Sequence, residues 1–460
     1  MVSLDMSKAF DTVNIHTLIT KVQSTNTPPT IIKFVANYLK GRKAYTMYKH
    51  ATSAQLKLKT GVPQGGVLSP TLFNIYMSDI PTPPEHVSLS TYADDITTLS
   101  SHVNTNTAHK NLQPYLNEIV TWTQNNDLQI NPDKSTSILF TPDQAEYNTT
   151  LNLHINNTLI PTVKHPKVLG VTYDPKLNYA QHTDLTKNKA SKTTNMLKAL
   201  TSTNWGKHKE TLITTFKAIT RPILEYGSTT WSPIISNTNL NKLQTVQNTA
   251  LRIATGCTAD TNIQHLHDET QVLPLDIHLK LQASQLKQKA QLATHPLHKY
   301  TTQQQAARNM KQTIFHNNNY TTNINNASTD ITEQDIQRNI KSIHTTVVAN
   351  YLANRKHNKI INEPAPKINE TEQTLPRGTR RTLAQLRTGK SPFLRTYKHK
   401  IDPLSQPTPT CPLCNIHEHT TQHLFTCTNI ATHLTPRDLW MDPVGVAALL
   451  ERWTDEIGRI

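Results

Sequence analysis

Short apolar runs alternate with helical spacings along the first part of the chain. Residues 2–4 begin an apolar run that predicts a strand, and two more strand-like runs flank Ala93-Asp94-Asp95 within residues 89–100. Strands that alternate with helical stretches over residues 1–165 predict an α+β fold for this region.

A different pattern follows in residues 182–295. Few strand signals occur there, and apolar residues recur at three- and four-residue spacings, which is typical of amphipathic helices. This region is therefore expected to form a helical domain. The segments with this spacing are 185–200, 207–220, 238–256 and 277–295.

Composition predicts linkers further along the chain. Residues 298–330 are rich in Gln, Asn and Thr and can bury little apolar surface, and residues 361–376 contain three prolines. A helix near residues 332–357 is expected between them. The sequence thus predicts four parts, at residues 1–165, 166–296, 297–376 and 377–460.

The net charge narrows the range of partners. Lys and Arg total 47 against 32 Asp and Glu, and the formal net charge of +15 favours polyanions, with nucleic acid first among them.

No apolar run reaches the roughly 18 residues of a membrane helix, and the N-terminal residues do not resemble a secretory signal. The four cysteines fit a reducing compartment, and Cys257, which stands apart from the others, is expected in a core.

Three aspartates are candidates for a metal site. Asp5 falls near the carboxyl end of the first predicted strand, and a tight hairpin would place Asp94 and Asp95 at its tip. Adjacent like charges raise one another's pKa, and a divalent cation between Asp5 and Asp94 would relieve their repulsion. Carboxylate oxygens are the ligands that Mg²⁺ prefers. A solvated turn is the alternative interpretation of the Asp-Asp pair.

A glycine-rich turn lies between these strands in the sequence. Gly61, Gly65 and Gly66 are three of only twelve glycines, and they permit a tight turn and a close approach of the backbone to a ligand. Ser69 is expected to be a helix N-cap and Pro70 the first helical residue. A glycine turn that leads into a helix N-terminus suits a phosphate or a base pair.

These stretches, in this order, resemble motifs A, B and C of reverse transcriptases, most closely those of jockey-like (LINE-type) non-LTR retrotransposons. The matching segments are LDMSKAFDTV, GVPQGGVLSPTLFNIYMSDI and YADD. NPDKSTSILF at residues 131–140 resembles motif D, and KVLGVTYD at residues 167–174 resembles the motif E primer grip. The similarity continues more loosely through residues 217–231, which resemble the thumb.

The resemblance implies a fold and a reaction. The fold is an α+β palm with a ferredoxin-like sheet and helices, followed by an α-helical thumb and a small C-terminal zinc-knuckle region. The reaction is RNA-directed DNA synthesis, in which Asp5 and Asp94 hold two catalytic Mg²⁺ ions and Asp95 supports them more weakly. The implied partners are an RNA template, a DNA primer or target, and a dNTP.

The same resemblance implies roles for six further residues. Phe10 would exclude the ribose 2′-hydroxyl, and Lys134 would protonate the leaving pyrophosphate. The alternatives are a core phenylalanine and a surface lysine. Gln64 and Gly65 would line the template–dNTP pocket. Leu169 and Gly170 would shape the turn that holds the primer end.

The chain departs from the family where the resemblance begins. Motif A starts at residue 2, whereas family members carry a fingers domain before it, and jockey-like elements also carry an endonuclease. The sequence therefore predicts a product truncated before motif A. Its activity in isolation is expected to be impaired, because positioning a dNTP needs more than a metal site.

A basic segment without acids covers residues 377–400. Its eight cations predict contacts with nucleic-acid phosphates, and Phe393 and Tyr397 among them could stack on unpaired bases. The alternative is a solvated basic helix without a partner. The eight residues are Arg377, Arg380, Arg381, Arg387, Lys390, Arg395, Lys398 and Lys400.

A Cys/His cluster follows in residues 411–427. Two cysteines lie two residues apart, and a histidine and a cysteine four apart can share a helix face, so four ligands would close one structural Zn²⁺ site. His417 and His419 are competing ligands, and free thiols are the alternative. The cluster also resembles the CCHC motif of many non-LTR retrotransposon polyproteins. The four expected ligands are Cys411, Cys414, His423 and Cys427.

Together these patterns predict the RNA-directed DNA polymerase portion of a non-LTR retrotransposon polyprotein, which acts in the nucleus and has a cytoplasmic ribonucleoprotein stage. The alternative is a catalytically inactive relic that binds nucleic acid through residues 377–427, with a steep salt dependence and no synthesis. The KAFD spacing and the C-terminal cluster disfavour a group II intron maturase. The oligomeric state is left open.

Overall fold

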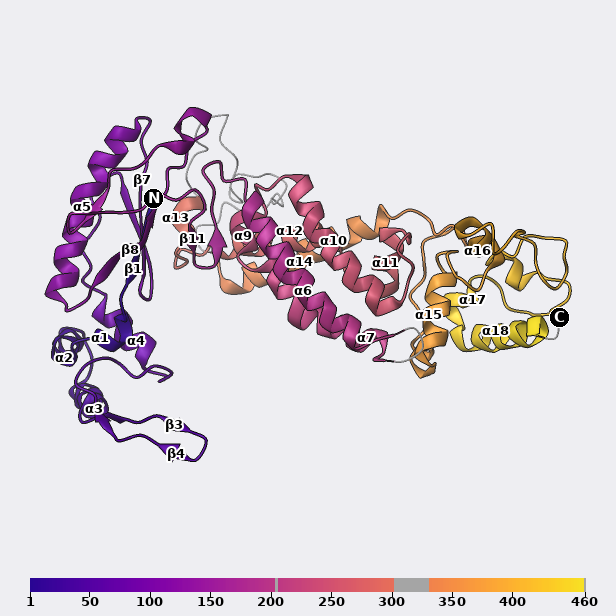
Figure 1. Ribbon diagram of the computed structural model, residues 1–460, viewed down its shortest axis with the longest axis horizontal. Helices are drawn as coiled ribbons and strands as arrows, with labels where there is room; N and C mark the ends of the chain where they lie inside the picture. Colours follow the sequence, from indigo (N-terminus) through magenta and orange to yellow (C-terminus); the bar gives the residue numbers. More distant parts are fainter. Residues whose placement is uncertain (203–205, 302–330, 459–460) are drawn as a thin grey trace. The chain divides into compact units, whose positions relative to one another are not determined.

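The computed structural model describes residues 1–202, 206–301 and 331–458 (Figure 1). The chain divides into two compact units, Met1–Gln181 and His182–Ile460. Most of the Gln/Asn/Thr-rich stretch expected as a linker lies outside the described residues.

A four-stranded antiparallel sheet forms the centre of the N-terminal unit (Figure 1). Its strands follow the order β6-β7-β1-β8. Helices separate β1 from β6 and β7 from β8, so the connectivity is βαββαβ, which is ferredoxin-like. The prediction of an α+β fold is confirmed. The strands are β1 (Val2–Met6), β6 (Val87–Tyr92), β7 (Asp95–Ser100) and β8 (Ile130–Ser137).

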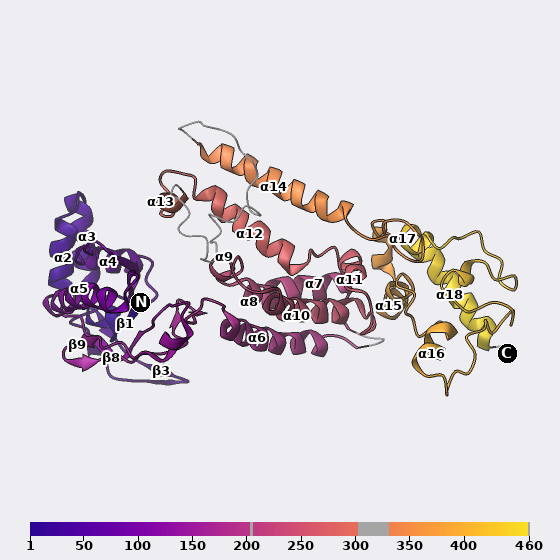
Figure 2. The same cartoon turned by 90° about the horizontal axis from the view of Figure 1, so that it is seen from above.

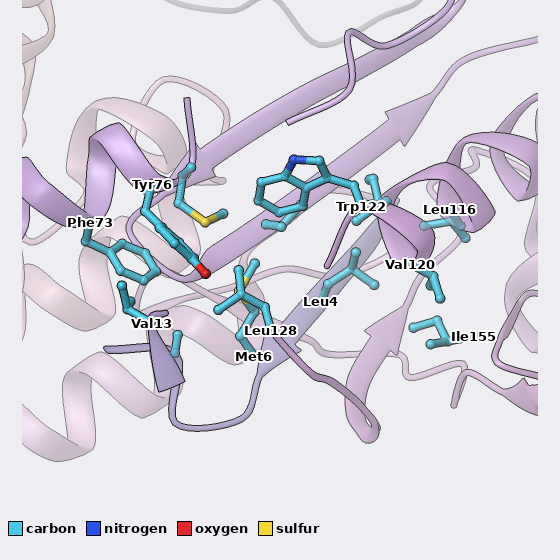
Figure 3. Close-up of a cluster of buried hydrophobic side chains, with 14 of the residues drawn as sticks. Leu4, Met6, Val13, Phe73, Tyr76, Leu116, Val120, Trp122, Leu128 and Ile155 are labelled. Atoms are coloured by element: carbon cyan, nitrogen blue, oxygen red, sulfur yellow. The ribbon is translucent and has the colours of Figure 1, made fainter. Parts of the chain in front are cut away.

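The pattern of β1 explains why it lies in the middle of this sheet. Val2, Leu4 and Met6 are buried, whereas the residues between them are less so, as expected for a strand with one face on a core. Figure 3 shows Leu4 and Met6 in the same apolar cluster as Trp122 of helix α5 (Thr105–Asn125). Apolar residues three or four apart give α5 its buried face: Leu112, Tyr115, Leu116, Ile119 and Val120.

Tyr76 ties the helix after the glycine-rich turn to the rest of the unit. Its ring is fully buried, and its hydroxyl donates to the carbonyl of Asn126 at 2.5 Å and accepts from the N–H of Asn14 at 3.2 Å. Helix α4 is therefore fixed against the ends of two other helices. The remaining helices of the unit are α1 (Ala9–Thr12), α2 (Ile15–Gln23), α3 (Pro29–Leu39), α4 (Ser69–Tyr76) and a 3-10 helix, Gln144–Asn148.

Four small antiparallel ribbons complete the N-terminal unit. They pair β2 (Lys43–Ala44) with β5 (Leu56–Lys57), β3 (Met47–Tyr48) with β4 (Ala51–Thr52), β9 (His154–Ile155) with β10 (Thr158–Leu159), and β11 (Lys167–Val168) with β12 (Val171–Thr172).

The described part of the C-terminal unit is mainly helical, as the spacing of apolar residues predicts. Each of the four predicted segments contains or overlaps a helix, and the helix expected near residues 332–357 is α14, which packs along α12 (Figures 1 and 2). The longer helices are α6 (Ala180–Ala199), α10 (Asn237–Thr255), α12 (Leu275–Lys289), α14 (Glu333–Ala353) and α18 (Pro443–Gly458). The shorter ones are α7 (Lys209–Thr215), a π-helical turn (Phe216–Thr220), α8 (Arg221–Glu225), α9 (Ser228–Trp231), α11 (Ile263–Thr270), α13 (His298–Thr301), α15 (Arg377–Leu386), α16 (Arg395–Ile401) and α17 (Asp438–Met441), with 3-10 helices at Glu370–Thr374 and His423–Phe425.

The last hundred residues build a small core of their own. Leu383 and Leu386 of α15 pack there with Trp440 of α17 and Trp453 of α18, and all four are buried. Cys411 belongs to the same core. Across the residues that the structure describes, no helix combines the length and the apolar character needed to cross a membrane.

Candidate active site and metal centre

Asp5 lies at the end of β1, where the sheet becomes irregular. Leu4 pairs with Ile96 of β7, so Asp5 comes next to Asp95 at the end of that ladder. On its other side β1 pairs with β8, and the register shifts between Ser3 and Asp5. The strand thus carries a half-exposed carboxylate near its carboxyl end, as predicted from its position in the sequence.

Asp94 and Asp95 lie in a tight turn between β6 and β7. Tyr92 pairs with Asp95 across the hairpin, which leaves Ala93 and Asp94 as the two loop residues, with φ +52° at Ala93. Burial raises the pKa of Asp95, and the charges of Asp94 and Asp5 raise it further. The structure therefore brings all three aspartates to one end of the sheet, where their charges interact.

The glycine-rich turn packs against the segment that follows Asp5. The N–H of Gly61 donates to the carbonyl of Val13, and that of Val62 to the carbonyl of Phe10, both at 2.8 Å. Gly61 has φ +82°, and a Cβ there would lie 2.8 Å from the carbonyl oxygen of Asp11, so only glycine fits. The amide of the exposed Gln64 donates to Asp11 at 3.0 Å, beside Gly65 with φ +83°.

One detail of this turn differs from the prediction. Helix α4 begins at Ser69 itself, not after it, and no side chain caps it. The Ser69 hydroxyl donates instead to the carbonyl of Pro63, which closes the turn on itself. Pro70 is accordingly the second helical residue, where its missing N–H still costs no hydrogen bond.

Phe10 is half-buried and stacks on Phe73 of α4, with ring centroids 4.3 Å apart and an interplanar angle of 17°. The stack fixes the ring between the helix that follows Asp5 and the helix that follows the glycine-rich turn. Both the expected contact with the sugar and the alternative core role are compatible with this placement.

Lys134 lies on a wide bulge of β8. Ser3 pairs with Thr136 and Asp5 with Asn131, so four residues of β8 oppose Leu4 alone. Lys134 is exposed on this bulge. Its neighbour Ser135 is fully buried and accepts a hydrogen bond from the N–H of Asp5 at 3.1 Å. Sequence reasoning missed Ser135, because nothing in NPDKSTS marks which hydroxyl turns inward.

Leu169 and Gly170 form the turn between β11 and β12, as the resemblance to motif E implies. Their φ values are +46° and +81°. Positive φ at both central residues is the geometry of a type I′ hairpin turn, which matches the twist of the two flanking strands.

The four expected zinc ligands come together. The ligand atoms of Cys411, Cys414, His423 and Cys427 all lie within 4.8 Å of one another, and no other described residues form so tight a group of three or more, the aspartates included. Cys411 Sγ is 3.9 Å from Cys427 Sγ, and Cys414 Sγ is 3.4 Å from His423 Nε2. Tetrahedral zinc requires about 3.8 Å and about 3.6 Å for these separations.

The surroundings of this group distinguish the competing histidines. His417 is exposed, although its ring lies 5.5 Å from that of His423. His419 is buried, and its Nδ1 accepts from the N–H of Arg395 at 3.2 Å. Main-chain N–H groups, led by that of His417, lower the pKa of Cys414, which favours the thiolate that binds metals. Burial raises the pKa of Cys411 to about 11.

Three arginines of the basic segment are buried, contrary to the expectation that they meet phosphates. Arg377, Arg380 and Arg387 are at most 8% exposed. Arg377 donates to the carbonyls of Lys207 and Ile253 at 2.9 and 3.1 Å, which fixes α15 against other helices.

Arg387 and Arg380 belong to a buried network of ion pairs. Arg387 contacts Glu269 at 3.0 Å and also pairs with Glu372, while Lys209 contacts the same two carboxylates at 2.8 and 3.0 Å. Arg380 pairs with Glu210. Arg387 and Lys209 neutralise Glu269 and Glu372, two carboxylates that would be costly to bury alone, and Arg387 thereby holds the basic segment inside its unit.

The five other cations of the basic segment are half-buried or exposed. Lys390 pairs with Asp260 at 2.7 Å, and Tyr397 donates to the same carboxylate at 3.1 Å. Phe393 packs against His419, with ring centroids 5.9 Å apart, and both predicted stacking rings are half-buried. Arg381 and Arg395 are half-buried, and Lys398 and Lys400 are exposed.

Cys257 is buried, as predicted.

Known proteins share sequence similarity with the N-terminal part of the chain. Residues 1–173 match the family model described as "Reverse transcriptase (RNA-dependent DNA polymerase)". Residues 1–173 are therefore similar to reverse transcriptases, which are nucleotidyltransferases, and the predicted resemblance is confirmed.

The similar proteins come from fruit-fly transposons. The chain is 28% identical over 263 residues to the "Probable RNA-directed DNA polymerase from transposon BS" of Drosophila melanogaster. The matched region covers 56% of this chain and 29% of that protein. It is 29% identical over 264 residues to the "RNA-directed DNA polymerase from mobile element jockey" of the same species, over 55% and 28% of the two chains. The chain thus spans less than a third of the length of these relatives.

Proposed function

We propose that the N-terminal unit catalyses RNA-templated DNA synthesis, in which a DNA primer is extended with dNTPs. The observation that carries this proposal is the junction of β1 with the β6–β7 hairpin, which brings Asp5 beside Asp94 and Asp95 in a reverse transcriptase domain. Three carboxylates at one end of the sheet, where desolvation and then the charges of Asp94 and Asp5 raise the pKa of Asp95, are a suitable donor set for Mg²⁺.

The chain's own residues divide the work of the reaction. Asp5 and Asp94 would hold the two metal ions, with weaker support from Asp95. When bound, Mg²⁺ would activate the primer 3′-hydroxyl and stabilise negative charge on the phosphates. The new bond joins O3′ to the α-phosphorus as the bond to the pyrophosphate oxygen breaks. Lys134, exposed on the β8 bulge, would give pyrophosphate its proton.

Substrate selection would rest on the segments packed around that edge. Phe10, fixed by its stack on Phe73, would occupy the space that a ribose 2′-hydroxyl needs. Gln64 and Gly65 would border the template–dNTP pocket. The Leu169-Gly170 turn would hold the primer end.

For the C-terminal unit we propose a supporting role. Its helices from α6 to α12, in the predicted thumb region of residues 166–296, would act as the thumb, and the Cys/His group would bind one structural Zn²⁺ ion. Nucleic-acid contacts from the basic segment would come from its accessible members, Arg395, Lys398 and Lys400. Integration into chromosomes would place the reaction in the nucleus.

Primer extension by the 460-residue chain tests the polymerase proposal directly. We expect Mg²⁺-dependent extension on an RNA template, and its loss in Asp94→Asn. Glu118→Gln, which removes an exposed carboxylate of α5, is the matched control and should extend normally. No extension by the unaltered chain, with RNA binding retained, would contradict the proposal and favour the inactive nucleic-acid-binding alternative.

A further inference from the structure

The ribbon of residues 43–57, named here the basic arm, has a surface that nothing in the proposed reaction uses. It consists of β2 and β3 returning through β4 and β5, and Figure 1 shows its β3–β4 end projecting beyond α3. Every residue from 43 to 57 is exposed. An isolated two-stranded ribbon is only marginally stable in water, so an arm of this kind is expected to gain order from a partner.

The base of the arm is firmly anchored. Arg42 donates to the carbonyls of Leu39, Thr60 and Gly61, and the N–H of Leu58 donates back to the carbonyl of Arg42 at 2.9 Å. Gly61 is the same glycine that packs against the segment after Asp5. The arm therefore extends from the rigid edge of the glycine-rich turn.

Charge identifies the chemistry of the partner. No Asp or Glu occurs between Asp11 and Asp79, a stretch that contains eight Lys and Arg residues. Lys43 lies directly opposite Lys57 across the ribbon, a like-charge pairing that destabilises a sheet unless an anion lies nearby. Neither lysine has an ion-pair partner among the described residues.

Exposed aromatic rings on the basic arm are a second, independent observation about the chemistry of the partner. Tyr45 is 56% and Tyr48 71% exposed, with Met47 and Leu56 similarly open at 70% and 68%. The Lys49 ammonium lies 5.5 Å from the centre of the Tyr48 ring. Cations interleaved with open aromatic faces suit a chain that offers both phosphates and unpaired bases.

We propose that the basic arm binds single-stranded nucleic acid, with phosphates at Lys43 and Lys57 and bases stacked on Tyr45 and Tyr48. A duplex would satisfy the lysines but not the rings, because its bases are already stacked. The surface deepens the proposed function by naming a strand-binding site, yet binding at the arm needs neither Mg²⁺ nor a dNTP.

The test is fluorescence anisotropy of the full chain with a labelled single strand, without Mg²⁺, over a series of salt concentrations. Lys43→Gln/Lys57→Gln is expected to make the slope of log K against log salt shallower by about 1.4, at about 0.7 per phosphate contact. Lys110→Gln/Lys164→Gln removes two exposed charges elsewhere in the same unit and should leave the slope unchanged. Equal effects of the two variants would overturn the proposal.

The rings are tested separately. Tyr45→Ala/Tyr48→Ala should weaken binding about tenfold or more, whereas Tyr45→Phe/Tyr48→Phe, which keeps both rings, should bind normally. Unaltered binding by the alanine variant would overturn the stacking. Because all four side chains are exposed, thermal unfolding of each variant should match that of the parent chain.

RNA and DNA strands of one sequence distinguish the source of the strand. Tighter binding of RNA would support a template site, and equal binding would support recognition by the chemistry the two share. Equal loss of duplex and single-strand affinity in the alanine variant would contradict the proposal. Asp94→Asn should abolish extension but retain binding at the arm, so failure of the polymerase proposal and failure of this one remain distinguishable.

Discussion

The main-chain N–H of Asp5 donates a hydrogen bond to Oγ of Ser135, 3.1 Å away, and Ser135 in turn donates to the carbonyl of Asn131 at 2.7 Å. Ser135 is fully buried on the bulge where β8 loses its regular pairing with β1. The serine therefore replaces the carbonyl that an uninterrupted ladder would offer to Asp5.

Ser135→Ala should impair the reaction by mispositioning Asp5. A buried N–H left without a partner costs about 1–3 kcal/mol, and the strand end is expected to shift to recover a hydrogen bond. The Mg²⁺ concentration needed for half-maximal extension should rise, an effect that a general loss of stability would not produce. Ser135→Thr keeps the hydroxyl and should need the same Mg²⁺ concentration as the parent chain. An unchanged Mg²⁺ dependence in Ser135→Ala would contradict the positioning role.

Phe10→Ala should reduce the preference for dNTPs over rNTPs. Removal of the ring opens the space proposed for a 2′-hydroxyl, and discrimination is expected to fall about tenfold or more, as measured by the ratio of kcat/KM values. Phe73→Leu disturbs the same stack from the other side and serves as the control, since it leaves the Phe10 ring in place. If both variants change the ratio equally, packing and not the ring at position 10 decides the selectivity.

Arg387→Met should strongly destabilise the C-terminal unit. The change would leave the buried carboxylates of Glu269 and Glu372 short of a cation, at an expected cost of about 3–5 kcal/mol. Hydrogen exchange of the amides in α15 measures this locally. Lys390→Met breaks the more exposed pair with Asp260 and should cost about 1 kcal/mol or less. Similar protection in the two variants would show that the buried network is not essential.

The same network predicts how the C-terminal unit responds to acid. Burial alone would raise the pKa of Glu372, but the charges of Arg387 and Lys209 hold it at about 2. The pKa of a glutamate in an unfolded chain is about 4.3. The stabilisation from the ionised Glu372 is therefore complete above about pH 5 and is lost as the pH falls toward 2. Hydrogen exchange of α15 should therefore accelerate over that interval. Glu372→Gln should flatten this dependence, and an unchanged acid profile in that variant would contradict the assignment.

Zinc binding by the Cys/His group is measurable on the intact chain. We expect one zinc ion per chain by elemental analysis, lost in Cys414→Ser and His423→Ala. Chelation should expose the core around Trp453 to hydrogen exchange, because Cys411 and Cys427 are part of that core. Cys257→Ala, outside the group, should retain the metal, and so should His417→Ala. Loss of zinc in His417→Ala would show that the alternative ligand is the one used.

Local patterns were sufficient to predict the parts of the candidate site that depend on short stretches of chain. A turn needs only a few residues of the right type, so the Asp94 hairpin, the Leu169-Gly170 turn and the glycine-rich turn could all be placed from the sequence. The order of motifs then gave the family, and helical spacing gave α6, α10, α12 and α14.

The basic segment shows the limit of such reasoning. Eight cations in sequence look alike, yet Arg387 is 2% exposed and Lys400 is exposed. What separates them is the presence of Glu269, more than a hundred positions away in the chain, at 3.0 Å from Arg387. A charge pattern records which side chains are present, but not which partner the fold brings to each.

The sequence by itself therefore predicted the resemblance to reverse transcriptases, the three aspartates that meet at one end of the sheet and the group of four Cys/His residues, because spacing along the chain constrains each of those sets. Only the tertiary structure decided that Ser135 supports Asp5 and that three arginines are buried. It also showed that residues 43–57 extend as an exposed arm. These features depend on contacts between distant segments, whose free energy is set by burial and pairing and not by local residue preference.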